Sequence, residues 1–208
     1  MTLDPVWQVR ATAWELAALS FRYPDGALEG AVESGEWAEA AREVAAALGL
    51  ELPEGFGEGT SAEGLRAEAT RLFVGAPEPA CSPYEGVWAA EADGVQPLLF
   101  VNPRSMEVER FARACGLGRP EGTNEPLDHV SAECELLEHL ALRAAGAEPP
   151  EGAPADADLP GGSPQAAYDA FLSEHARAWM PAFAARAAAD SRHPFYRAAA
   201  AYLGALAG

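Results

Sequence analysis

The feature that most constrains the fold is an amphipathic pattern over residues 126–141. At about 100° per residue, the apolar side chains of this stretch fall on one face of a helix. That face comprises Leu127, Val130, Cys134, Leu137 and Ala141, and it is widened by Leu136 and Leu140. Pro126 suits a first helical turn, with Asn124 or Glu125 as its cap. We therefore predict a helix that begins near Pro126 and packs this face into a core.

Several other stretches repeat the helical spacing, so we predict an all-α fold. Alanine, leucine, glutamate and arginine dominate them, and β-branched residues are scarce, which favours helices over sheets. We expect helices over residues 6–21, 28–48, 105–115, 164–178 and 194–206, and a further helix that starts at a Thr60/Glu63 capping box and runs to Phe73. Pro181 should bend or end the helix that contains it.

A stretch of Pro, Gly, Ala and Asp over residues 147–163 has almost nothing to bury and reads as a linker or hinge. A chain of 208 residues suffices for one domain with a sizeable core, or at most two small domains. We therefore predict a larger N-terminal helical part over residues 1–146, which carries the motifs described below, and a smaller C-terminal helical part over residues 164–208.

The net charge of -18 makes some classes of partner unfavourable. An acidic surface repels nucleic-acid phosphates and anionic lipids and favours a basic partner. No apolar stretch is long enough to span a bilayer, and the N-terminal residues lack the pattern of a secretory signal. Cys81, Cys115 and Cys134 lack the spacing of a disulfide framework or a metal site. We expect a cytoplasmic protein that inserts into no membrane and binds no nucleic acid.

Glu133 is the most informative single residue, because it falls inside the apolar arc of the helix. A carboxylate half-buried in this way is unfavourable unless a cation or hydrogen-bond donors meet it. Its partner is either His129, one turn earlier, or a group from outside the helix. A Glu and a His four residues apart are also commonly just a local pair. Both a structural and a functional interpretation of Glu133 are therefore open.

Two stretches resemble the motifs of a known family. Glu125, Pro126, Asp128, His129 and Glu133, followed by Leu136 and Leu137, are similar to the Glu-Pro-x-Asp-His-x-x-x-Glu motif of the TorD/DmsD/NarJ family, the cytoplasmic chaperones dedicated to molybdenum enzymes. Cys134 departs from it, since the family more often has Leu there. A second stretch resembles the family's Leu-Phe, proline-containing loop and Pro-Pro-Tyr/Trp-Glu pattern, with Leu72, Phe73, Pro83, Tyr84, Glu85 and Trp88 at the matching positions and Ser82 in place of the first proline.

The resemblance implies a TorD-like helical bundle that is a chaperone and not an enzyme. The implied partner is the catalytic subunit of a molybdenum oxidoreductase, bound through an N-terminal peptide that carries a twin-arginine signal where the client is exported. The chaperone would assist folding, cofactor insertion and assembly before export. The implied peptide-binding residues are Leu72, Phe73, Pro83, Tyr84, Glu85, Trp88, Glu125, Pro126, Asp128, His129 and Glu133.

Within that set, Glu85, Asp128 and Glu133 are candidate acceptors for peptide arginines, because a guanidinium group suits a carboxylate. His129 would orient the carboxylates or cap the helix. We expect no catalytic residue, no cofactor and no metal, and either a monomer or a domain-swapped homodimer. Tyr84 and Trp88, four residues apart, could instead be the core face of a short helix.

Two other functions stay open. A metal- or nucleotide-dependent helical enzyme could use His129, Glu133, His139 and Cys134, although His139 falls on the opposite side of the helix and no glycine-rich phosphate loop precedes a helix. A generic helical scaffold is the third alternative.

Overall fold

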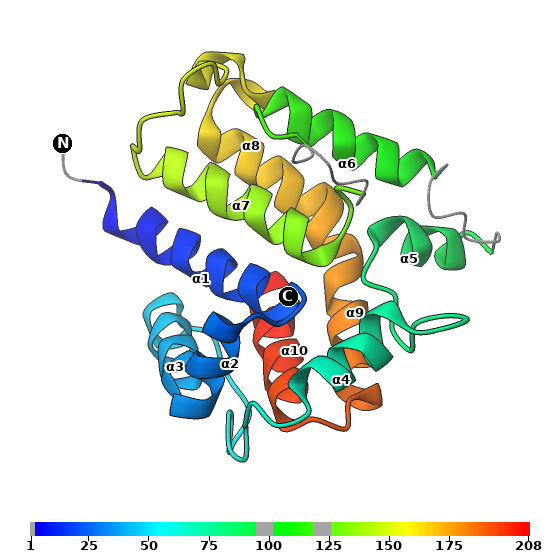
Figure 1. Cartoon of the computed structure of the whole chain (residues 1–208). Coiled ribbons are helices and arrows are strands. Elements are labelled where there is room, and N and C mark those ends of the chain that lie inside the picture. The colour runs from blue at the N-terminus through cyan, green and yellow to red at the C-terminus, as the bar shows by residue number, and fades with distance from the viewer. Residues whose placement is uncertain (1–2, 95–101, 119–125) are drawn as a thin grey trace.

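Two long helices, α1 (Pro5–Phe21) and α7 (Val130–Ala144), lie side by side across the middle of the structure, a computed structural model that describes residues 3–94, 102–118 and 126–208 (Figure 1). The described part of the chain contains helices and one isolated bridge pairing but no β-strand, which confirms the all-α prediction. None of its helices is both long and apolar enough to cross a membrane.

The other elements surround this pair. Along the chain they are α2 (Gly26–Ser34), α3 (Glu36–Leu48), α4 (Leu65–Ala69), the π turn η1 (Thr70–Val74), α5 (Glu85–Ala92), α6 (Pro103–Ala114), the 3-10 turns η2 (Asp156–Asp158) and η3 (Pro160–Gly162), α8 (Pro164–Phe171), the π turn η4 (Leu172–Ala176), α9 (Arg177–Asp190) and α10 (Pro194–Ala207). In Figure 1, α2 and α3 lie on one side of α1, and α8 and α6 lie beyond α7.

One hydrophobic core joins the early and the late helices. Trp14 of α1 donates its Nε1 hydrogen to the hydroxyl of Tyr168 in α8, at 2.7 Å. Trp37 of α3 packs edge-on against Phe195 of α10, with ring centroids 4.8 Å apart. The residues of this core therefore come from both sides of residues 147–163, and the predicted division into parts 1–146 and 164–208 stays a prediction.

Two predicted helix boundaries are wrong. The helix expected over residues 28–48 is divided at Gly35, whose φ of 81° lies in the left-handed region and ends α2 before α3 begins. The helix expected from the Thr60/Glu63 capping box starts only at Leu65, with Gly64 as its cap and without a side-chain hydrogen bond. Glycine tolerates the left-handed conformation at both junctions, and this local effect outweighs the helical pattern.

The central helix also begins later than expected. Its first residue is Val130, and His129 is the cap, since its Nδ1 accepts the Ser131 N–H. Pro126 therefore precedes the helix instead of forming its first turn. Asn124 and Glu125, the expected caps, lie outside the described residues. The expectation that His129 caps the helix is confirmed.

The segment over residues 147–163 is docked on the molecule, contrary to the expectation that it has almost nothing to bury. Leu159 is buried, and the Arg143 side chain of α7 donates to Asp156 and to the Pro154 carbonyl.

Pro181, expected to bend or end its helix, lies inside α9, which continues to Asp190. The π turn η4 immediately precedes α9, so the helical path from α8 is already irregular before the proline.

Candidate functional site

The two motif stretches meet through backbone hydrogen bonds. The Glu85 N–H donates to the Asp128 carbonyl at 2.9 Å, and the Val130 N–H donates to the Pro83 carbonyl at 2.8 Å. Tyr84 and His129 form the isolated antiparallel bridge between these bonds, and their rings lie 5.2 Å apart, edge to face. The start of α5 is thereby fixed against the start of α7.

The Asp128 side chain stabilises the junction between the start of α5 and the start of α7. Its Oδ2 accepts the Gly86 N–H at 3.0 Å and the Ser105 hydroxyl at 2.6 Å, so it caps α5 and holds α6. A Cβ on Gly86 would lie 2.4 Å from Ser105 Oγ and 3.0 Å from Asp128 Oδ2, so the junction leaves no space for a side chain there. Burial raises the pKa of Asp128, while these two donors lower it.

Glu133 and Glu85 belong to a buried polar cluster between α5, α6, α7 and α9. The Trp179 Nε1–H donates to Glu133 Oε2 at 3.0 Å. Glu85 pairs with Arg104 at 2.8 Å and with His175 Nδ1 at 3.1 Å. Burial, and then the neighbouring Glu85, raise the pKa of Glu133 well above its usual value. The partner of Glu133 thus comes from outside its helix, one of the two alternatives left open by the sequence.

These contacts correct the expected chemistry of the three carboxyl groups. Glu85, Asp128 and Glu133 are each at most 1% exposed, and each accepts hydrogen bonds from groups of the chain itself. In this conformation none of them offers an oxygen to an arginine from outside. A helical wheel predicts that Glu133 faces the core, but it cannot show that Trp179 and Glu85 meet it there.

His129 is neutral in this setting. Burial lowers the pKa of His129 to about 4. Its Nδ1 accepts the Ser131 N–H and lies 2.8 Å from the Ser131 hydroxyl. The side chain therefore acts as a helix cap that holds the junction and not as a cation that would repel a basic ligand.

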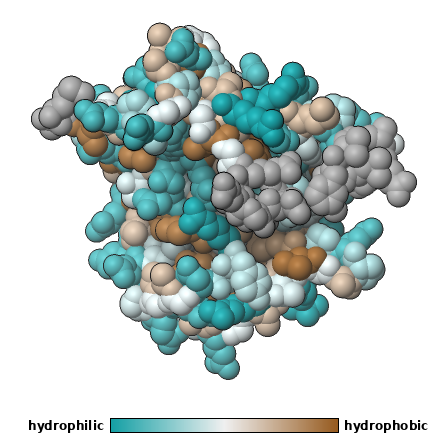
Figure 2. Space-filling model, turned by 45° about the horizontal axis from the view of Figure 1, so that its top comes forward, coloured by the Kyte–Doolittle hydropathy of each residue, from teal (hydrophilic) through white to brown (hydrophobic). Residues whose placement is uncertain are grey.

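A groove of about 410 Å³ runs above the junction. Its lining includes Phe21, Arg22, Tyr23, Phe73, Val74, Pro83, Tyr84, Leu117, Pro126, Leu127, His129, Glu135 and Leu136. Figure 2 shows one face of the molecule on which hydrophobic side chains lie in a hollow across the middle, between hydrophilic ones. Five residues predicted from the motifs, namely Phe73, Pro83, Tyr84, Pro126 and His129, line this groove together.

The remaining predicted residues lie elsewhere. Leu72 is buried in the core. Trp88 is partly buried, donates its Nε1 hydrogen to the Ser82 carbonyl at 2.8 Å and lines the neighbouring hollow beside Val74 and Tyr84. Glu125 lies outside the described residues. Trp88 thus combines the two alternatives considered for it, since it packs against Phe183 and also borders a surface hollow.

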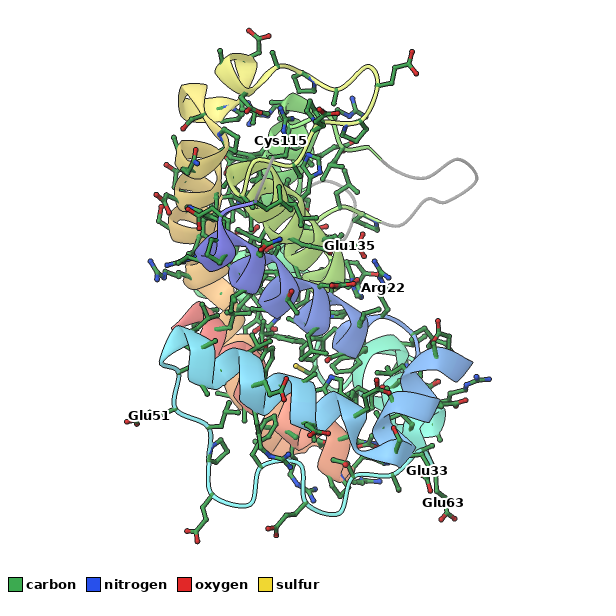
Figure 3. The ribbon with its side chains drawn as sticks, turned by 90° about the vertical axis from the view of Figure 1, so that its left-hand side faces the viewer. Arg22, Glu33, Glu51, Glu63, Cys115 and Glu135 are labelled. Carbon is green, nitrogen blue, oxygen red and sulfur yellow. The ribbon has the colours of Figure 1, made fainter. Side chains whose placement is uncertain are left out.

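Among the described residues that line the groove, the accessible carboxylate belongs to Glu135, which the sequence analysis did not select. Arg22, at the end of α1, points toward it, as Figure 3 shows, and Arg22 Nη2 lies 2.7 Å from Glu135 Oε1. Their side chains are 49% and 40% exposed. The sequence did indicate that Glu135 is accessible: on the helical wheel that places Glu133 in the core, Glu135 faces outward. The contribution of Arg22 depends on the packing of α1 against α7 and could not be read from spacing.

The side chains considered for a metal or nucleotide site do not assemble. Within residues 3–94, 102–118 and 126–208, no group of three or more His, Cys, Asp or Glu side chains is placed to hold a metal ion. Burial raises the pKa of the Cys134 thiol well above its usual value and lowers the pKa of His139.

Comparison with known proteins agrees with the motifs. A family model described as nitrate reductase delta subunit matches residues 33–185. Chaperone protein TorD of Vibrio cholerae serotype O1 (strain M66-2) is 32% identical over 129 residues, which cover 62% of this chain and 52% of TorD. TorD of the O395 strain is 31% identical over the same length. The chain thus spans about half the length of the curated relatives it matches.

A solved structure shares the fold. It is a protein from Archaeoglobus fulgidus described as a redox enzyme maturation protein, with a TM-score of 0.57 and 19% identity over 92% of this chain and 90% of that chain. Because the family model matches well over half of the sequence, the chain belongs to the nitrate reductase delta subunit family, which confirms its resemblance to the TorD/DmsD/NarJ chaperones.

Proposed function

We propose that this chain is a cytoplasmic chaperone, not an enzyme, that binds the N-terminal peptide of a molybdenum oxidoreductase catalytic subunit and assists its folding, cofactor insertion and assembly. The observation that carries this proposal is the convergence of three separate segments on one groove. Phe73, Tyr84 and His129 come from different elements and line the same apolar surface, with Glu135 at its edge. TorD and the A. fulgidus maturation protein support the chaperone class.

The groove suits a peptide that is both apolar and basic. Its floor includes the buried Phe21, Phe73 and Leu136, which can pack against an apolar segment. The rim carries Glu135, whose carboxylate can accept an arginine. A chain with a net charge of -18 also attracts a cationic peptide over a longer range. A twin-arginine signal, with its basic and apolar parts, has this composition.

The test is a binding titration with the N-terminal peptide of a molybdoenzyme encoded by the same genome. Val74 at the groove is 60% exposed, and Val6 at the start of α1 is 58% exposed and lies outside the groove. Losing the contact of one valine should reduce affinity about tenfold in Val74→Ser, whereas the matched Val6→Ser should bind as the wild type does. Equal affinities for both variants, or no binding by the wild type, would contradict the proposal.

The salt dependence of peptide binding provides an independent test. Attraction between exposed charges is screened as ionic strength rises, whereas apolar contacts are not. Affinity for the peptide should therefore fall as sodium chloride is added, and the fall should be smaller for a peptide whose arginines are replaced by glutamine. A salt response that is the same for both peptides would show that the arginines are not recognised.

A further inference from the structure

The ion pair between Arg22 and Glu135 joins the end of α1 to α7 at the edge of the groove, and both residues line it (Figure 3). Arg22 Nε donates to Glu135 Oε1 at 2.8 Å, and Nη2 lies 2.7 Å from the same oxygen. The structure thus already contains a guanidinium group on the accessible carboxylate of the groove. It comes from the chain itself.

The contact uses only half of the carboxylate. Both nitrogen atoms of Arg22 meet Oε1, and no hydrogen bond to Oε2 is found among the described residues. The strongest pairing between a guanidinium group and a carboxylate engages both oxygens in parallel. A half-exposed pair with a single shared oxygen contributes little to stability and is readily replaced.

Among the described residues, acidic side chains outnumber basic ones around this pair. Burial, followed by the charge of Glu15, raises the pKa of Glu138 to about 7, with Arg22 acting in the opposite direction and Glu135 in the same direction as Glu15. Among the described residues, Arg22 is thus the cation that acts on Glu138, against the negative charges of Glu15 of α1 and Glu135 of α7. The surroundings favour a second guanidinium group beside or in place of the first.

We propose that Arg22 is an internal substitute for the arginine of the partner: it occupies Glu135 in the free chain, and an arginine of the bound peptide takes its place. This inference rests on the proposed function, because it assumes that the occupant of the groove is an arginine-bearing peptide. It identifies Glu135 as the residue that recognises the peptide arginine, and Arg22 as the residue that competes with that arginine for Glu135.

The experiment compares Arg22→Gln with a matched variant in a titration of one probe. The probe is a synthetic peptide with two adjacent arginines before a leucine-rich segment. Arg66→Gln is the control, because Arg66 also pairs with a glutamate of another helix, Glu29, is 52% exposed and does not line the groove. Removing the competitor should raise affinity about fivefold in Arg22→Gln. Arg66→Gln should bind as the wild type does.

The double variant identifies the carboxylate. Glu135→Gln alone should weaken binding, and in that background Arg22→Gln should no longer raise affinity. Binding by the wild type with no gain in Arg22→Gln, or an equal gain in Arg66→Gln, overturns the inference and leaves the proposed function standing. A gain that persists without the Glu135 charge also overturns it. Absence of binding by both the wild type and Arg22→Gln contradicts the inference and the proposed function together.

Discussion

The buried carboxyl group of Glu133 is stabilised as a neutral group. Trp179 donates to Oε2, Oε1 has no hydrogen-bond partner in the described part of the chain, and the neighbouring Glu85 side chain helps to raise the pKa of Glu133. A proton on Glu133 satisfies this arrangement, since a protonated carboxyl group can donate to its neighbour. Glu85 itself is paired with Arg104 and His175.

We therefore expect Glu133→Gln to be nearly harmless. The amide of glutamine can donate to Glu85 and accept from Trp179, so the free energy of unfolding at neutral pH should change by less than about 1 kcal/mol. Peptide affinity should also be retained. Urea unfolding and fluorescence anisotropy measure the two quantities.

Glu133→Ala is the contrasting variant, because it removes the hydrogen bond from Trp179 and leaves a cavity, and it should lower the free energy of unfolding by about 2–4 kcal/mol. If Glu133→Gln folds normally but no longer binds the peptide, Glu133 is a direct acceptor of arginine, as the motif alone suggested, and the buried structural role is wrong.

Glu138 provides a test of pH dependence. Its pKa is raised to about 7 in the folded chain, above the value of 4.5 expected when unfolded, so the folded state binds this proton more tightly. The stabilisation of the folded state by this protonated side chain is therefore fully present below about pH 4.5 and is lost as the pH rises through 7. Glu138→Gln should gain stability relative to the wild type between pH 5 and pH 8, by about 1 kcal/mol once solvent screening is included. A difference between the two chains that stays constant across urea titrations at these pH values would contradict this.

The helices were predictable where a local signal marks their ends. Asp4 before Pro5 and Ser163 before Pro164 cap α1 and α8, and both side chains accept backbone N–H groups of the first turn. The start of α7 was not predictable, because the residues before Val130 pair with the segment that contains Tyr84 instead of continuing the helix. This tertiary contact joins two segments 45 residues apart, and no local pattern reveals it.

The candidate site was likewise predictable only in part. The motifs selected Phe73, Pro83, Tyr84, Pro126 and His129, which the fold brings to one groove. They did not reveal which carboxylate is accessible, because that depends on contacts between α5, α7 and α9. They also did not reveal Arg22, which is 113 residues from its partner in sequence.

The junction between α2 and α3 yields a prediction with an internal control. Gly35 has a φ of 81°, and a Cβ there would meet nothing within 4 Å, so an alanine suffers only from the backbone conformation. Gly35→Ala should lower the free energy of unfolding by about 1–2 kcal/mol. Gly30 lies inside α2 with equal space around it but an ordinary φ, and Gly30→Ala should raise the free energy of unfolding by up to about 1 kcal/mol. Equal effects in urea titrations would show that the junction is not strained.

At the scale of the whole molecule, the early and late helices depend on each other. The Trp14–Tyr168 hydrogen bond and the contact between Trp37 and Phe195 both join residues from the two sides of the segment 147–163. That segment is also docked, through Leu159 and through the pairing of Asp156 with Arg143. A single core of this kind should unfold in one cooperative step.

We accordingly expect urea unfolding curves recorded by tryptophan fluorescence and by far-ultraviolet circular dichroism to coincide, since tryptophans occur on both sides of residues 147–163. Leu159→Ala should shift the whole transition, lowering the free energy of unfolding by about 2–3 kcal/mol, because a buried leucine is truncated. Leu19→Ala, at a leucine 38% exposed on α1, should shift the transition far less.

Two separate transitions, with Leu159→Ala affecting only one of them, would instead show that residues 1–146 and 164–208 fold as distinct parts. The segment between them would then be a hinge, as its composition alone suggests, and exchange of the C-terminal part between two chains would become a feasible route to a dimer.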